Sequence, residues 1–217
     1  MTEQRWLASA DPQKMLEFLR GKASDRKLRL FACAYGRAVR DSQHLLGPST
    51  AAVAERYADW LAGDQDLSAE RRSNACFPEE RWPVAPSAYN GAREAVDWLA
   101  RYRDLMRIDP DALRHCPIPL DDVGERSVLL LRDIFSNPFR PASVSPGWQS
   151  PVVQGLAQAA YDHRELPAGT LDVARLAVLA DALEEAGYTD ADMLNHCRRP
   201  GVHVRGCWAV DLLLGKV

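Results

Sequence analysis

The sequence predicts an all-α fold, a compact and bundle-like domain of several helices joined by Pro-rich connecting loops. Apolar residues recur at spacings of three and four along most of the chain, which is the period of a helix face. No segment sustains the alternation of apolar and polar residues that indicates a strand. With 217 residues, of which 47% are hydrophobic, the chain is long enough to bury a substantial core.

The first helices have recognisable beginnings and ends. Asp11 is expected to cap a helix that Pro12 opens and Gly21 ends, because Asp accepts from free helix amides and Pro suits the first turn. A second helix is predicted from residue 24 to about residue 40. Apolar residues at helical spacing predict a third helix over 51–61.

Three Pro-rich segments interrupt the helices. They cover residues 74–87, 108–122 and 136–151, and we expect all three to be loops. Between the first two, the apolar pattern predicts a helix over 88–102. A short, strongly apolar helix over 128–135 lies between the last two.

The C-terminal part continues with helices. Ser150 and Pro151 open one of them, and Thr170 opens a longer one that Gly187 caps. Thr189 starts a short helix that ends before Pro200.

The second Pro-rich segment suggests two helical subdomains, 1–107 and 108–217; the alternative is one continuous domain. Residues 1–40 hold nine Lys or Arg against four Asp or Glu, a balance of +5. Because the whole chain has a net charge of −3, the rest of the chain carries −8. No apolar run is long enough to span a membrane, and the N-terminus lacks the apolar core of a signal peptide. Five scattered Cys favour reduced thiols, and we expect a soluble, cytoplasmic protein.

Five cations fall on one side of the second predicted helix. On a wheel of 100° per residue they lie within a sector of about 80°, and Cys33 lies among them. We call this set the basic ridge; it comprises Lys22, Arg26, Arg29, Arg37 and Arg40. One hypothesis makes it a binding surface for an acidic protein or another anionic surface, with Cys33 as a reactive thiol of lowered pKa. The alternative is a solvated helix face that pairs with the acidic face of the helix predicted after Thr170.

A group of His and Cys residues near the C-terminus suggests a metal or thiol site. His196 and Cys197 precede a Pro-Gly turn, and His203 and Cys207 follow it, on one face if the final helix begins by His203. These four side chains offer the nitrogen and sulfur donors that zinc prefers, although the spacing is not that of a known finger and adjacent His196 and Cys197 cannot easily share one ion. The alternative is that both Cys are small core residues and His203 is a hydrogen-bonding group.

Several segments carry a resemblance to a known group of proteins. They are residues 26–33, 131–135 with 137–141, 179–187, 203–208 and 211–214. The chain resembles a large group of uncharacterised bacterial proteins, loosely labelled SMI1/KNR4-like or repeat-companion proteins. The resemblance implies an adaptor or regulatory module, since no catalytic set accompanies the group. Members often carry further Cys where this chain has Tyr35 and Gly36, so the resemblance implies no shared N-terminal metal cluster here.

Together these observations predict a non-catalytic helical interaction or regulatory module that binds an unknown protein partner through the basic ridge. The alternative is a metal-binding protein, with zinc or iron, or a reactive-thiol protein. The chain shows no Gly-rich phosphate loop, no nucleophile elbow and no His-Glu-x-x-His pair, so we expect no enzyme. No cofactor is expected, with zinc as the alternative. Nucleic acid is disfavoured because the aromatic residues of the basic helix lie opposite its cations.

Overall fold

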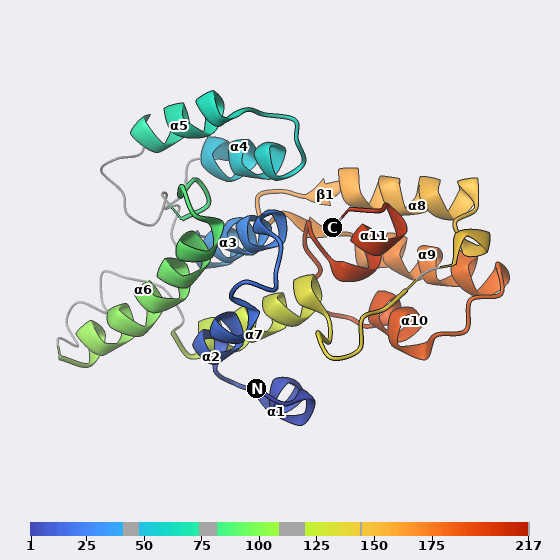
Figure 1. The fold of residues 1–217 in the computed structure, drawn as a ribbon, viewed down its shortest axis with the longest axis horizontal. Helices are drawn as coiled ribbons and strands as arrows, with labels where there is room; N and C mark the ends of the chain where they lie inside the picture. Colours follow the sequence, from blue (N-terminus) through green and yellow to red (C-terminus); the bar gives the residue numbers. More distant parts are fainter. Residues whose placement is uncertain (41–47, 74–81, 109–119, 144, 217) are drawn as a thin grey trace. The chain divides into compact units, whose positions relative to one another are not determined.

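The computed structural model describes residues 1–40, 48–73, 82–108, 120–143 and 145–216. Within these ranges the chain is mostly helical, with one short two-stranded sheet, and the all-α prediction is confirmed (Figure 1). The backbone groups into two units, Met1–Leu131 and Arg132–Val217, each of which is described by itself below. The division falls within α7 (Leu120–Phe135), whereas the Pro-rich loop suggested a boundary at 107/108.

The first unit contains six helices before α7 in its described residues. They are α1 (Glu3–Ala8), α2 (Pro12–Leu19), α3 (Asp25–Arg40), α4 (Pro48–Ala58), α5 (Asp64–Ser73) and α6 (Ala88–Ile108). The side chain of Asp11 accepts hydrogen bonds from the amides of Gln13 and Lys14, which is the predicted cap of α2. The sequence did not predict α1 or α5, which are short and polar.

Helix α3 is the centre of the first unit, where it packs against α4 and α6. A chain of aromatic rings runs from α3 to α6, because Tyr35 lies 5.9 Å from Trp82 and Trp82 lies 5.5 Å from Trp98 between ring centroids. Helix α6 approaches this chain closely at Gly91. A Cβ at that position would overlap the carbonyl oxygen of Trp82, so the packing requires Gly.

The second unit follows from the end of α7. It contains a 3-10 turn (Pro146–Trp148), α8 (Pro151–Asp162), β1 (Arg164–Glu165), β2 (Thr170–Leu171), α9 (Val173–Glu185), α10 (Ala191–Arg198) and α11 (Trp208–Leu213). Helix α9 packs against both α8 and α10, and α11 packs against α8. Their apolar faces, together with Leu171 and Tyr188, form one buried core.

Two predictions about the second unit were wrong. Thr170 does not open α9; it pairs with Glu165 in the antiparallel hairpin, and Asp172 is the N-cap instead. His203 does not begin the final helix, because the next residue, Val204, forms a bridge with Thr170. Both errors involve the bridge between Thr170 and Val204, which are distant in the sequence, and local spacing carries no sign of that pairing.

Candidate metal centre

Asp133 lies on α7 in otherwise apolar surroundings. Its neighbours Leu130, Leu131 and Ile134 are fully buried, and the carboxylate itself is only 1% exposed. A buried carboxylate needs partners, because its transfer from water is costly. Oδ2 accepts a hydrogen bond of 2.9 Å from the amide of Val204, while Oδ1 faces two imidazole rings.

His203 is held in place by the loop between α10 and α11. Its carbonyl accepts a hydrogen bond of 2.8 Å from the amide of Leu171, which attaches the loop to β2. Its Nδ1 lies 2.8 Å from Oδ1 of Asp133, and its Nε2 lies 3.2 Å from the carbonyl oxygen of Arg199. Backbone contacts therefore fix the ring with Nδ1 toward the carboxylate.

His196 comes from α10, which Asp190 caps at its N-terminus. Its Nε2 lies 3.2 Å from Oδ1 of Asp133 and 3.2 Å from Sγ of Cys207. Its ring meets that of His203 edge to face, with centroids 4.8 Å apart, and packs at 5.0 Å against Trp208. The aromatic contacts and the two polar contacts together define the direction of the ring.

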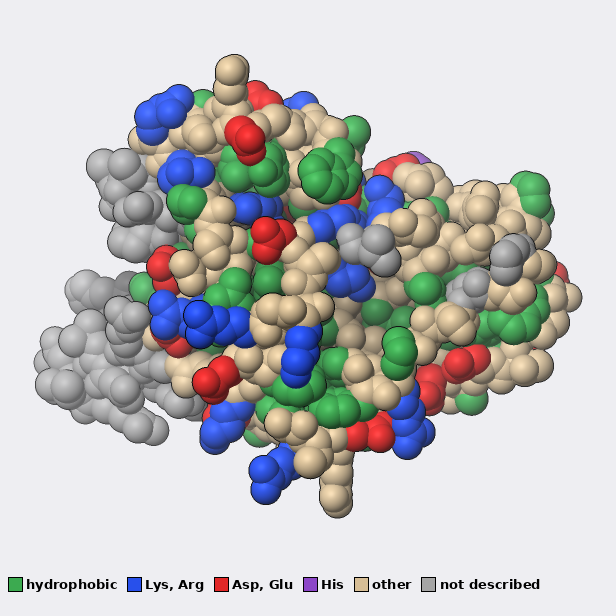
Figure 2. All heavy atoms as spheres, viewed as in Figure 1, with side chains coloured by type: hydrophobic (Ala, Val, Ile, Leu, Met, Phe, Trp, Pro, Cys, Tyr) green, Lys and Arg blue, Asp and Glu red, His purple; other side chains and the backbone are tan. Residues whose placement is uncertain are grey.

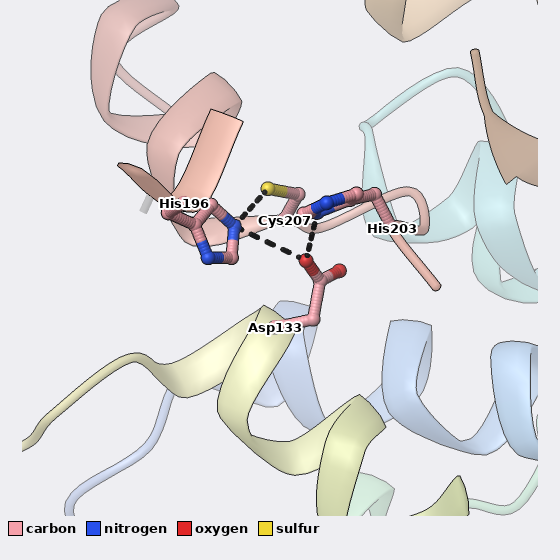
Figure 3. A group of neighbouring side chains, drawn as sticks. All are labelled: Asp133, His196, His203 and Cys207. Atoms are coloured by element: carbon pink, nitrogen blue, oxygen red, sulfur yellow. Dashed lines mark hydrogen bonds and ion pairs between the residues drawn. The ribbon is translucent and has the colours of Figure 1, made fainter. Parts of the chain in front are cut away.

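Cys207 occupies the N-cap of α11. A turn precedes it, in which Gly206 has a φ of 96° and the Cys207 amide donates to the carbonyl of Val204. The Cys207 carbonyl accepts a hydrogen bond from the amide of Asp211, and this bond is the first of helix α11. This turn and helix start point Sγ at His196 (Figure 3).

The four side chains converge on one point. One donor atom from each of Asp133, His196, His203 and Cys207 lies within 4.8 Å of the others, and all four residues are buried. In a catalytic Cys-His-Asp relay the His contacts Cys and Asp through opposite ring nitrogens. Here Nε2 of His196 faces both Sγ and the carboxylate, so the arrangement is convergent (Figure 3). Convergent N, O and S donors are the pattern of a metal site.

Electrostatics in the group follow from burial and from the carboxylate. Burial raises the pKa of Asp133, but hydrogen bonds and charges of His196 and His203 outweigh burial and hold that pKa below its ordinary value. Burial lowers the pKa of His203, yet the hydrogen bond to Asp133, the charge of that carboxylate and the contact with the Arg199 carbonyl together raise the pKa above its ordinary value. Burial also raises the pKa of Cys207 well above its usual range, so without a metal the sulfur is a neutral thiol.

Three of the four side chains expected at a metal site therefore come together, and the fourth does not. Cys197 is fully buried in the apolar core of the second unit, and it is outside the convergent group. Burial raises the pKa of its thiol to about 12. Its backbone neighbour His196 points to the group, and successive helix residues diverge by about 100°, so both cannot face one ion.

Asp133 takes the place expected for Cys197, and it was not among the ligands predicted from the sequence. Its signal in the sequence is a single carboxylate in the strongly apolar segment 128–135. Such a residue on a buried helix face must be paired or bind a metal. Its distance along the chain from the His and Cys residues concealed the partnership.

The basic ridge is largely internal, unlike the exposed face suggested by the helical wheel. Arg26 binds Asp59 through Nε and Nη2 at 3.1 and 3.0 Å, and Arg37 binds Glu55 through Nε at 3.1 Å. These two arginines and their partner carboxylates are all buried. Arg29 is buried too and donates to the carbonyls of Pro83 and Ala85. Both carboxylates lie on or directly after α4, not on the acidic helix α9.

The remaining members of that set differ from one another. Lys22 is exposed and lies over the ring of Phe18, 3.4 Å from its centroid. The side chain of Arg40 lies outside the described residues. Cys33 is 1% exposed, and its thiol contacts the carbonyl of Ala51 at 3.8 Å. On the face shown in Figure 2, Lys and Arg side chains are interspersed with Asp and Glu.

No family model, curated protein or solved structure matches this chain. The resemblance to the uncharacterised bacterial group therefore stays a prediction. Among the described helices, none is both long and apolar enough to cross a membrane.

Proposed function

We propose that the chain is a metal-binding protein in which the convergent group takes one divalent ion, with zinc as the natural occupant. The ligand atoms are Oδ1 of Asp133, Nε2 of His196, Nδ1 of His203 and Sγ of Cys207. The single observation that carries this proposal is the convergence of four donor atoms within 4.8 Å at a buried point. Two imidazoles, one thiolate and one carboxylate suit a four-coordinate zinc ion.

The charges support a divalent ion. With Asp133 and Cys207 ionised and both His neutral, the four ligands carry a total charge of −2. A divalent cation neutralises that charge. An uncompensated buried charge would cost several kcal/mol. Metal binding also gives a reason for a buried polar group of this size in the core of a small unit, because the ion would replace the present hydrogen bonds with stronger bonds.

Contacts outside the ligand set support the same proposal. Metal-bound His usually donates its second ring N–H to a carbonyl or carboxylate, and ligating carboxylates are themselves hydrogen-bonded. Nε2 of His203 lies 3.2 Å from the Arg199 carbonyl, which suits an N–H donor, and Oδ2 of Asp133 accepts from Val204. These contacts leave Nδ1 of His203 and Oδ1 of Asp133 for the metal.

The role we propose is structural. The ligands come from α7, α10, the loop after α10 and the start of α11. One ion would therefore join four segments of the second unit and fill a tetrahedral shell with protein ligands, as closed structural zinc sites do. Its binding energy would add to the stability of the fold.

Elemental analysis of the full chain, purified without chelator or added metal, tests this function. We expect about one zinc per chain, and its loss in Cys207→Ser. The matched control is Cys197→Ala, which changes a neighbouring buried thiol that is outside the group and should keep the zinc. Metal-free wild-type protein that also fails to bind added zinc would refute the proposal.

The interaction-module hypothesis remains a prediction without a supporting observation of this kind. Arg26, Arg29 and Arg37 have partners within their own unit. A partner protein would have to displace those carboxylates and carbonyls before it reached the guanidinium groups.

A further inference from the structure

The four proposed ligands are not held equally. Asp133, His203 and Cys207 are each 1% exposed, and each is fixed by the backbone. The Val204 amide binds Oδ2 of Asp133, and the Arg199 carbonyl lies against Nε2 of His203. The backbone of Cys207 is bonded on both sides, through its amide to Val204 and through its carbonyl to Asp211.

His196 lacks this support. It is the most exposed member of the group, at 8%. Its Nε2 makes the two contacts within the group, and among the described residues no hydrogen bond reaches its Nδ1. Its ring also packs on Trp208, which is itself 8% exposed. Both polar contacts of the ring are to other members of the group, so within the described residues no hydrogen bond from outside the group orients it.

We infer that His196 is the exchangeable ligand of the centre, and that its position accepts a small neutral donor from solution, such as an imidazole or a water molecule. This inference rests on the proposed metal site. Zinc sites with three protein ligands and one open position bind exogenous molecules, and release of His196 would convert the four-ligand centre into a site of this kind. Asp133, His203 and Cys207 would form the permanent set, and His196 would close the fourth position.

The exchange is a simple ligand substitution. The bond from the metal to Nε2 of His196 breaks, and a bond from the metal to the incoming lone pair forms. The metal keeps its oxidation state, and a neutral donor brings no change in charge. The ring of His196, which at 8% is the most exposed of the four side chains, is the one that leaves toward solvent.

Cobalt substitution and imidazole rescue test the inference, because tetrahedral Co²⁺ absorbs visible light according to its ligands. The full-length variants His196→Gly and His196→Ala should each bind one Co²⁺ per chain, with affinity at least about tenfold weaker than wild type. Added imidazole should restore the wild-type spectrum in His196→Gly. The Ala variant controls for the helix propensity that Gly loses within α10.

His203→Gly is the matched control, since it removes the other imidazole from the same centre. We expect it to lose Co²⁺ and to show no recovery with imidazole, because its ring is part of the permanent set. Two results would overturn the inference: neither His196 variant binds Co²⁺, or imidazole rescues His203→Gly as well as His196→Gly. If wild type itself binds neither Co²⁺ nor zinc, the proposed function fails first, and this is seen before any variant is compared.

Discussion

Oδ1 of Asp133 and Nδ1 of His203 lie 2.8 Å apart, between two side chains that are each 1% exposed and 70 residues apart in the sequence. The same carboxylate binds the amide of Val204, the next residue after His203. One acid on α7 therefore positions both a ring and the backbone of the loop that carries it.

Asp133→Asn should destabilise the protein even without metal. The variant removes the charge that His203 faces and leaves buried polar atoms poorly paired, at a cost on the order of 3 kcal/mol in the free energy of unfolding. Urea unfolding of metal-free wild type and variant measures the difference. Asp181→Asn is the control, because that carboxylate is 65% exposed and its loss should leave the midpoint unchanged. Equal midpoints for Asp133→Asn and wild type would contradict the buried pairing.

The pH dependence of stability should differ between metal-free and zinc-loaded protein. The pKa of Asp133 is lowered on folding, so its contribution is present above about pH 4, its unfolded pKa, and is lost as pH falls through the folded value. The pKa of His203 is raised, so its contribution is present below about pH 6.5 and is lost as pH rises through the folded value.

Metal-free protein should therefore lose stability as pH rises above about 6.5, while zinc binding strengthens there because the ligands are deprotonated. Thermal melts from pH 5 to pH 8.5, with and without zinc, measure both trends. A zinc-induced increase in Tm that shrank toward alkaline pH would argue against His and Cys ligands.

Arg37 and Glu55 form a buried ion pair, and the loss of one partner should cost more stability than the replacement of both. Arg37→Ala removes the paired charge from a carboxylate that is 3% exposed, and we expect a loss of about 3–5 kcal/mol in the free energy of unfolding. Replacing both residues with apolar ones, Arg37→Met with Glu55→Leu, should recover most of that loss. Urea unfolding of Arg37→Met alone, Glu55→Leu alone and the double variant gives the coupling energy. A negligible cost for Arg37→Ala would instead favour an arginine kept for an external partner.

Two helical glycines should respond in opposite directions to Ala. Gly91→Ala places a methyl group against the carbonyl of Trp82 and should destabilise the protein by about 2 kcal/mol or more. Gly155 in α8 has open space at the same position, so Gly155→Ala should stabilise by about 0.5–1 kcal/mol through helix propensity. Thermal melts of both variants decide the point. A neutral Gly91→Ala would show that α6 does not approach Trp82 so closely.

Local signals predicted the helices well and the long-range pairings badly. The caps at Asp11 and Ser150, and the period of the apolar residues, lie within a few positions of the elements they determine. The bridge between Thr170 and Val204 depends on residues that approach only after folding. The helical wheel groups cations on one side of α3, but it carries no information on whether α4 covers them.

The site shows the same contrast. His196, His203 and Cys207 are close in sequence and were grouped from it, whereas Asp133 comes from a helix more than sixty residues earlier. The adjacent Cys197 was predicted as a ligand because a thiol is a metal donor. Both residues lie on α10, and because adjacent helix residues face different directions, only His196 faces the group. A cluster of donor types in sequence thus identifies the region, and the fold selects the ligands.

X-ray absorption at the zinc edge, on full-length protein given one equivalent of zinc, measures the proposed ligand shell itself. We expect one sulfur at about 2.3 Å and three nitrogen or oxygen atoms at about 2.0–2.2 Å, from Cys207, two His and Asp133. Two sulfurs would place Cys197 in the centre. A shell of six oxygens would mean that zinc binds elsewhere, and either result would contradict the ligand set.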